Sequence, residues 1–344
     1  MATYKTTYYL ASLQYKEVQA AWMDLEKGMD MSYFQSYNWY MSVLPYQLKD
    51  NWLHENLIVV VEKDGLPALI APLTIIKHNW LHYNKKGVYL MGRNGWSDYL
   101  NFIYRDFDGE TVEALFSDIK EKYGIVDWYF EQLRESSALY TYIINRKTVL
   151  KSFKKVCVAL ELPESEEKYL ASLSKSVRQN IRTARNRLAK DGKELHFVLD
   201  DKNIDKQKLE ALRAGRLGKK NYESNIIKQC KNRMKEMLNF HYPVYLPFYV
   251  DKESHVMVAY EGDEAKAFFN YGLDKTHQNI VLMAVGTDES FTRYSPGMLL
   301  MLEFIKEQIS LKEMNVIDFT RGNEFYKYAL GGKDHYLFYG HVKI

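Results

Sequence analysis

The feature that most constrains the fold of this chain is a pattern that occurs twice. A short apolar run, Leu57–Val61, is followed by Asp64-Gly65 and a second apolar run, and the same order returns at His255–Tyr260 with the turn Gly262-Asp263. A glycine–aspartate pair between two apolar runs predicts a two-stranded hairpin. In each copy a helical segment and a short strand follow. The sequence therefore predicts two copies of one α/β unit.

The elements expected around this repeat share the alternating or helical periodicity of half-buried segments. The strands are expected at Ala68–Ile76, Ile125–Phe130, Leu195–Leu199, Ala265–Leu273, Asn279–Val285, Val316–Phe319 and Phe338–Ile344, and the helices at Glu110–Lys122 and Met298–Leu311. A length of 344 residues suits about two domains. We expect a boundary near Leu150 to Leu162, which gives an N-terminal domain, residues 1–155, and a C-terminal domain, residues 156–344, with a basic helical segment at 164–242.

Composition excludes several classes of protein. With 47% hydrophobic and 26% charged residues, the chain is not disordered, collagen-like or a disulfide framework. No apolar run approaches the roughly 20 residues that cross a bilayer, and no signal-type segment follows Met1, so we expect no membrane span and a cytoplasmic protein. Cys157 and Cys230 could form one bridge, but two buried thiols are the simpler expectation. The histidines show no metal-binding spacing, so no metal is expected.

The middle of the chain is basic. Between Ser174 and Lys235, lysine and arginine outnumber acidic residues by more than two to one, whereas the remainder carries a net negative charge. Arg178, Arg182 and Arg185 fall on one helical face, beside an apolar stripe made of Val177, Ile181, Ala184 and Leu188. Either these arginines border a cleft and bind an anionic substrate or phosphate, or they form a solvated basic face.

A second anion site is expected where the second copy opens its helix. Proline near the first helical position and a glycine beside it favour a helix start, whose free N–H groups and dipole attract phosphate. The candidate cofactor-binding residues are Arg293, Tyr294, Ser295, Gly297 and Met298. The matching residues of the first copy, 105–110, are acidic and would repel a phosphate. The alternative is that this turn only starts a helix.

The residues after the last expected core strand, Thr320–Gly332, carry a resemblance to a known family. Their order resembles the GNAT acyltransferases, in which that strand is followed by a helix that carries a tyrosine and ends in a glycine. The second half resembles the CelD/BcsL-like acetyltransferases of the GNAT superfamily. The pieces that carry the resemblance are Phe34–Trp39, Trp96–Phe102, Ser174–Arg182, Tyr294–Leu300 and Asp318–Lys327. The resemblance runs from about Phe34 to about Gly332, and the tandem GNAT architecture, shared with the Fem aminoacyltransferases, agrees with the repeat.

The resemblance implies two tandem GNAT-like units, with mixed sheets flanked by helices, the first unit being degenerate. It also implies direct acyl transfer from acetyl-CoA or another acyl-CoA to an amine or hydroxyl of a small-molecule or saccharide acceptor, such as a polysaccharide precursor. Tyr326 matches the GNAT tyrosine and is the candidate acid that protonates the departing thiolate. Its alternative is a tyrosine of the core.

Four further residues are candidates with a structural alternative each. Asp98 is a candidate base or acceptor-orienting group, or else a turn aspartate. Asp318 could orient the acceptor or cap the helix expected near Gly322. Glu324 and Lys327, one turn apart on that helix, are candidate substrate-binding residues or an exposed ion pair.

Two other functions compete with acyl transfer from acyl-CoA. A Fem-like aminoacyltransferase would use aminoacyl-tRNA, with the basic segment facing RNA. Against this reading, no long paired-helix arm is clear between Asp205 and Phe240. Nucleic acid is therefore expected only under this alternative. The third reading is a non-catalytic binding protein of a polysaccharide biosynthesis system.

Overall fold

The computed structural model describes residues 2–43, 54–79, 85–93, 97–201, 203–205, 207–213 and 254–344. Contacts divide these residues into two compact units. The described residues up to Val156 and those from His335 onward form unit 1, and those from Cys157 to Asp334 form unit 2. The end of the chain thus returns to the first unit.

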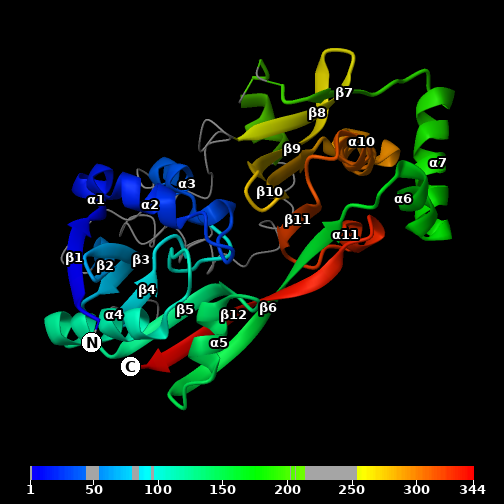
Figure 1. Cartoon of the computed structure of the whole chain (residues 1–344). Coiled ribbons are helices and arrows are strands. Elements are labelled where there is room, and N and C mark those ends of the chain that lie inside the picture. The colour runs from blue at the N-terminus through cyan, green and yellow to red at the C-terminus, as the bar shows by residue number, and fades with distance from the viewer. Residues whose placement is uncertain are drawn as a thin grey trace. The chain divides into compact units, whose positions relative to one another are not determined.

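Unit 1 is a mixed sheet with helices packed against it (Figure 1). Its strands follow the order β1-β2-β3-β4-β5-β12, and all neighbours are antiparallel except β4 and β5. The strands are β1 (Tyr4–Leu10), β2 (His54–Lys63), β3 (Leu66–Ile76), β4 (Gly87–Leu90), β5 (Asp127–Arg134) and β12 (Lys333–Lys343). The helices are α1 (Ala11–Gln14), η1 (Tyr15–Val18), α2 (Gln19–Leu25), η2 (Tyr33–Gln35), α3 (Tyr37–Val43), α4 (Gly109–Tyr123) and α5 (Ala138–Ile144).

Unit 2 repeats this arrangement. Its strands follow the order β6-β11-β10-β9-β8-β7, and only β10 and β11 are parallel. The strands are β6 (Val149–Glu161), β7 (His196–Leu199), β8 (His255–Glu261), β9 (Glu264–Asp274), β10 (Asn279–Thr287) and β11 (Val316–Arg321). The helices are α6 (Glu166–Ser172), α7 (Lys175–Lys190), the 3₁₀ helix η4 (Glu289–Tyr294), α10 (Pro296–Leu311) and α11 (Phe325–Ala329). Figure 1 shows α10 between strands β8–β10 and helix α7.

The two strand orders match element by element, which confirms the repeat read from the sequence. Strand β2, with Val59, and strand β8, with Val258, each lie second from an edge. Helices α4 and α10 each connect the two parallel strands of their unit. Both hairpins form where expected, because Asp64 (φ 52°), Gly65 (φ 81°) and Gly262 (φ 57°) adopt the left-handed conformation that tight hairpin turns require.

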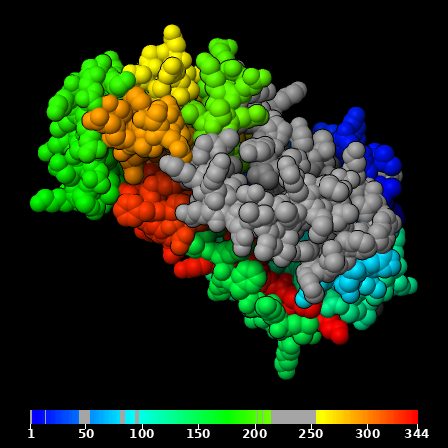
Figure 2. Space-filling view, turned by 180° about the vertical axis from the view of Figure 1, so that it is seen from behind, coloured from blue at the N-terminus to red at the C-terminus, as the bar shows by residue number. Residues whose placement is uncertain are grey.

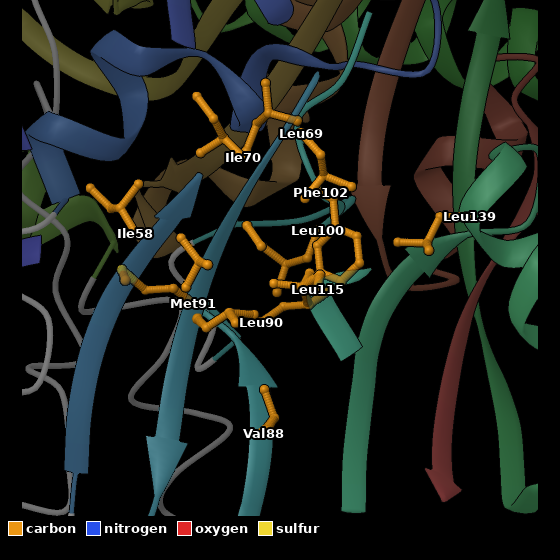
Figure 3. Packing of buried hydrophobic residues seen from close by; sticks show 14 of the residues in the cluster. Ile58, Leu69, Ile70, Val88, Leu90, Met91, Leu100, Phe102, Leu115 and Leu139 are labelled. Atoms are coloured by element: carbon orange, nitrogen blue, oxygen red, sulfur yellow. The ribbon is translucent and has the colours of Figure 1, made fainter. Parts of the chain in front are cut away.

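Each unit has its own apolar core. In unit 1, side chains from β2, β3 and β4 meet Leu100, Phe102 and Leu115 of the following segments (Figure 3). In unit 2, α10 packs on β8, β9 and β10, and the apolar stripe of α7 is buried against it as expected. Figure 2 shows the green atoms of α6 and α7 bordering the orange atoms of α10.

The segment expected to hold the domain boundary is a 13-residue strand, β6, and the division between the two units falls inside it, between Val156 and Cys157. One expectation about local structure is wrong. The helix expected near Gly322 begins only at Phe325, because Thr320 (φ 58°) and Gly322 (φ 107°) adopt left-handed backbone conformations that no α-helix contains.

Three smaller observations concern only the part of the chain that the structure describes. Cys157 is buried and forms no disulfide, whereas Cys230 lies outside the described residues. No helix among the described segments is both long and apolar enough to cross a membrane. The segment Asp205–Phe240, where a paired-helix arm was sought, lies mostly outside the described residues.

Candidate active site

The parallel strands β10 and β11 separate at one end. They pair only from Asn279 opposite Val316 to Val281 opposite Asp318, although β10 continues to Thr287. A bulge in β10 between Leu282 and Ala284 and an irregularity in β11 after Asp318 bend the two strands apart. Among the described residues, the backbone of the last part of β10 therefore has no strand partner on the β11 side, which leaves hydrogen-bonding groups for a ligand.

A cavity of about 240 Å³ lies beside this open end of β10, within unit 2. It is bounded by the end of β10, by β9, by the first turn of α10 and by one residue of α11. Most of its side chains are apolar, which suits an alkyl chain. The lining residues are Phe268, Phe269, Val285, Gly286, Thr287, Thr292, Ser295, Pro296, Gly297, Met298, Leu300, Met301 and Tyr326.

The start of α10 faces this cavity without a side-chain cap. Ser295 holds a left-handed conformation (φ 50°, ψ 49°), and its hydroxyl makes no capping hydrogen bond. Its carbonyl oxygen accepts the N–H groups of Met298 and Leu299, each at 3.1 Å, while Pro296 has no N–H. A side chain at Gly297 would place Cβ only 3.1 Å from Thr287 Oγ1, so glycine permits the close approach of α10 to β10. An uncapped helix start of this kind favours an anion.

Tyr326 reaches the same cavity from α11. Its ring is half-buried and meets Phe319 of β11 edge to face, with ring centres 6.4 Å apart and an interplanar angle of 86°. The structure thus brings Tyr326 together with three of the five candidate cofactor residues, namely Ser295, Gly297 and Met298. A phenol, a helix start and a divergent strand pair around one apolar cavity suit a substrate with an anionic end and a reactive end.

The sequence of unit 2 matches a known enzyme family. Residues 175–328 match the family described as "Acetyltransferase (GNAT) domain". This stretch is similar to a GNAT acetyltransferase domain. It contains every residue that lines the cavity. The match supports an acetyltransferase, whereas membership of the CelD/BcsL-like family is not confirmed.

Solved structures extend the likeness to the whole chain at the level of fold. FemX covers 98% of this chain, with 97% of its own length aligned, at 10% identity and a TM-score of 0.59. A conserved protein of unknown function from Bacteroides thetaiotaomicron VPI-5482 aligns over 100% of both chains at 11% identity and a TM-score of 0.52. A tandem GNAT protein from the clavulanic acid biosynthesis pathway aligns over 99% of this chain and 98% of its own, at 10% identity and a TM-score of 0.49. The search of curated proteins gave no match.

The side chains of Arg293 and Tyr294 do not line the cavity of unit 2. The Tyr294 hydroxyl donates to Asp191 Oδ2 at 2.6 Å, and Arg293 Nη2 lies 3.3 Å from the same oxygen. The Tyr294 hydrogen bond is the main cause that lowers the pKa of Asp191, and it raises the pKa of Tyr294 in turn. Arg187 donates to the carbonyl oxygen of Arg293 at 3.0 Å. These contacts attach the end of α7 to the turn before Ser295.

The three candidate arginines of α7, Arg178, Arg182 and Arg185, have three different environments. Arg178 donates to the carbonyl oxygens of Ala171 at 3.0 Å and Leu173 at 2.6 Å, and so closes the end of α6. Arg185 pairs with Glu303 of α10 at 2.7 Å. Arg182 is exposed to solvent. Arg185 is exposed as well, but its charge is shared with Glu303, so Arg182 is the first candidate of the three for an anionic ligand.

Two candidates near α11 serve its connection to β11. Asp318 is buried, and its Oδ1 accepts the N–H of Thr320 at 2.7 Å, so it supports the left-handed Thr320 and not a helix start. Glu324 and Lys327 form the ion pair given as the structural alternative, but the pair is not an exposed one, because the Lys327 side chain is only 2% exposed. Glu324 lies 3.0 Å from Lys327 Nζ and occupies the position before the first residue of α11.

Asp98 belongs to unit 1, whereas the cavity lies in unit 2. It is 7% exposed and sits in a segment held by buried polar contacts. Next to it, Ser97 Oγ accepts from Trp39 Nε1 at 2.7 Å, and the Tyr99 hydroxyl lies 2.9 Å from His335 Nε2. Residues 94–96, part of the loop expected to line a cleft, lie outside the described residues.

Sequence reasoning missed most of the cavity wall. The strand residues Phe268 and Phe269 of β9 and Val285–Thr287 of β10 were not among its candidates. The signal that could have found the β10 residues is position, because they end the strand that leads into the uncapped helix. Across the described ranges, no group of three or more histidine, cysteine, aspartate or glutamate side chains could hold a metal ion.

Proposed function

We propose that the chain transfers an acyl group, with acetyl first among the candidates, from acyl-CoA to an amine or hydroxyl of a sugar or polysaccharide precursor in the cytoplasm. The family match supports the acetyltransferase class. The choice of acetyl-CoA and of a saccharide acceptor comes from the resemblance of the sequence to the CelD/BcsL-like enzymes.

The observation that carries the proposal is the meeting of three features at one cavity. The open end of β10, the uncapped start of α10 and the Tyr326 ring all border it. In our assignment the phosphates of CoA bind at Ser295–Met298, where the helix dipole favours negative charge. The amide-containing arm runs along Val285–Thr287, whose backbone has no partner on the β11 side. The thioester then reaches Tyr326.

The proposed chemistry is a direct transfer. The acceptor nitrogen or oxygen forms a bond to the acyl carbon, and the bond between that carbon and sulfur breaks. Tyr326 gives its phenolic proton to the departing sulfur, and either a carboxylate or water takes the proton of the acceptor. We retain Asp98 of unit 1 as the candidate carboxylate. Holding the two reactants in register supplies much of the rate.

We also propose that residues 1–155 and 156–344 derive from two GNAT-like units, of which only the second binds acyl-CoA. The start of α4, the counterpart of α10 in unit 1, supports this division. Asp108 caps α4 by accepting from the N–H of Glu110 at 3.1 Å, and it pairs with Lys63 at 2.7 Å. A helix start already occupied by a carboxylate leaves no site for a phosphate.

The proposal is tested by binding and by turnover with the intact chain. Calorimetry should show acetyl-CoA binding that Gly297→Glu abolishes while circular dichroism stays unchanged. A panel of acyl-CoAs is then incubated with nucleotide-linked amino sugars, and the free thiol of released CoA is measured. Thiol release that needs both substrates supports the proposal. Absence of acyl-CoA binding would favour the non-catalytic protein, and binding of charged tRNA in its place would favour the Fem-like reaction.

A further inference from the structure

Lys327 is a buried lysine whose Nζ lies among backbone oxygens of the segment that connects β11 to α11. It donates to the carbonyl oxygens of Thr320 at 3.2 Å, Arg321 at 2.7 Å and Gly322 at 3.1 Å. A fourth oxygen, Glu324 Oε2, lies 3.0 Å away. The ammonium group thus donates to three carbonyl oxygens, which matches its three N–H bonds, and forms an ion pair with Glu324. Without the lysine, three carbonyl groups of this segment would lose a hydrogen-bond partner, which is costly in a buried place.

The backbone of the same segment is held in conformations that need support. Thr320 has φ 58° and Gly322 has φ 107°. A left-handed conformation in a residue other than glycine is strained and persists only when surrounding contacts fix it. The structure shows two such contacts, the Asp318 carboxylate on the N–H of Thr320 and the Lys327 Nζ on its carbonyl oxygen.

Helix α11 depends on this segment for its position. It has only five residues, far below the length at which a helix is stable by itself. Tyr326 is the second of those residues and Lys327 the third. Because the Lys327 side chain ties α11 back to the end of β11, it fixes where the helix begins and hence where the Tyr326 ring meets the cavity.

We propose that Lys327 is a positioning residue of the acyl-transfer site, which holds the phenol of Tyr326 at the cavity by locking the connection between β11 and α11. Lys327 itself does not line the cavity and, in this proposal, touches neither substrate. This inference rests on the proposed function, in which Tyr326 protonates the departing thiolate.

The first test is a double-mutant cycle. Lys327→Met keeps the length of the side chain and removes its donors. We expect turnover to fall about 10- to 100-fold, since a displacement of about 1 Å can cost about 100-fold, while the KM for acetyl-CoA changes less than about threefold. In a Tyr326→Phe background the same substitution should cost less than about twofold, because the group it positions is already absent. An equal cost in both backgrounds, or unchanged turnover in Lys327→Met, would overturn the proposal.

A matched control separates positioning from general stability. Lys306 of α10 also holds two carboxylates, Glu166 at 3.0 Å and Glu303 at 3.2 Å, but does not line the cavity. Lys306→Met should have the same effect in both backgrounds. If Lys327→Met does not fold, Gly322→Ala replaces it. A Cβ there would lie 2.4 Å from Glu324 Oε2, so this change disturbs the same segment without touching the lysine, and it should give the same coupling to Tyr326.

A spectroscopic test works without turnover. 3-Fluorotyrosine is placed at position 326, and its ¹⁹F resonance is recorded in the wild-type, Lys327→Met, Gly322→Ala and Lys306→Met backgrounds. The first two substitutions should shift or broaden the line, and the third should leave it unchanged. A line unaffected by either change in the segment would overturn the proposal. If the wild-type chain releases no thiol from any acyl-CoA, the proposed function fails, and this measurement still decides whether Lys327 positions Tyr326.

Discussion

The two units use the same strand order but treat the start of their crossover helix in opposite ways. In unit 1, Asp108 caps α4, accepting from the N–H of Glu110 and from the hydroxyl of Thr111 at 2.7 Å, while Lys63 neutralises its charge. In unit 2, the start of α10 has a left-handed Ser295 and no side-chain cap. One helix start is filled by the protein and the other is left open beside a cavity.

The difference shows how a repeated fold can specialise. The helix dipole favours an anion at both starts. Unit 1 supplies that anion from its own chain, which adds stability and removes a binding site. Unit 2 omits it, which costs stability and leaves the site to a ligand. We therefore propose that the first copy serves as a support and that the second keeps a place where a phosphate can bind.

The last core strands differ in a parallel way. Both carry one left-handed residue other than glycine, Gln132 (φ 62°) in β5 and Thr320 (φ 58°) in β11. In unit 1 the side chain of Gln132 donates to the carbonyl oxygen of Arg93, which follows the neighbouring strand β4, at 2.8 Å. In unit 2 the distortion leads directly into α11 and is held by Lys327. The left-handed residue thus contributes to packing in unit 1, whereas in unit 2 it lies in the segment that leads to the candidate site.

The largest effect should come from Tyr326, the candidate catalytic residue at the cavity of unit 2. Tyr326→Phe retains the ring against Phe319 but removes the proton that the departing sulfur would receive. We expect turnover to fall about 10²- to 10⁴-fold with little change in acyl-CoA affinity. Steady-state kinetics and calorimetry measure the two quantities. A loss well below tenfold in a normally folded variant would assign Tyr326 to the core.

The next effect should come from the open helix start. Gly297→Glu places a carboxylate where we expect the CoA phosphates, and repulsion of like charges costs several kcal/mol. Acetyl-CoA affinity should fall at least about 100-fold by calorimetry. Asp108→Ala, which removes the carboxylate from the equivalent helix start of unit 1, is the control and should leave that affinity unchanged. Unchanged binding by Gly297→Glu would place the cofactor elsewhere.

Much of the fold follows from short-range signals in the sequence. The turns at Asp64-Gly65 and Gly262-Asp263, and the proline and glycine at the start of α10, act through their own backbone preferences, so their positions were predictable. Strand β6 was not, because lysines at 151, 154 and 155 break its apolar alternation, and only its neighbours in the sheet make it a strand.

The candidate site was predictable only in part, for the same reason. Gly297 and Tyr326 were found because one marks a helix start and the other occupies a family position. The orientation of Tyr294 toward Asp191 and the burial of Lys327 depend on residues far away in sequence or on left-handed backbone conformations, and neither leaves a pattern in the sequence. Charge alone could not distinguish the accessible Arg182 from Arg178, which caps α6.

Asp98 tests whether unit 1 contributes chemistry or only shape. If its carboxylate receives the proton of the acceptor, Asp98→Asn should lower turnover about 100-fold, at the low end of general base catalysis, with acyl-CoA binding unchanged. Stopped assays of thiol release at saturating acetyl-CoA measure this. Unchanged turnover in Asp98→Asn would mean that water carries the proton away. Unit 1 would then contribute shape alone, and unit 2 would contribute the chemistry.

Substitutions of Arg182 and Arg178 in α7 should have smaller effects, the first on KM and the second on stability. Arg182→Gln should raise the KM for an anionic substrate a few-fold, and added salt should mimic it, because salt screens exposed charges. Arg178→Gln should instead lower stability by about 1–3 kcal/mol, since it leaves carbonyl groups at the end of α6 unpaired. Thermal unfolding and kinetics separate the two. A KM that responds to Arg178→Gln alone would reverse our assignment.

The smallest expected effect tests the comparison itself. Asp108→Ala should destabilise the first turn of α4 by about 1 kcal/mol, the usual value of an N-cap, whereas Ser295→Ala should cost α10 almost nothing, because Ser295 makes no capping bond.

The effect of Asp108→Ala on the stability of α4 should also depend on pH. The hydrogen bond from Lys63 is the main cause that holds the pKa of Asp108 below its ordinary value of about 3.9. A carboxyl group whose pKa is lower in the folded state stabilises that state fully above its unfolded pKa, and this stabilisation is lost as the pH falls through the folded pKa. Hydrogen exchange of the α4 amides should therefore differ between wild type and Asp108→Ala at neutral pH, and the difference should shrink below about pH 4. A difference that persists at low pH would show that the carboxylate is not what fills the helix start of unit 1.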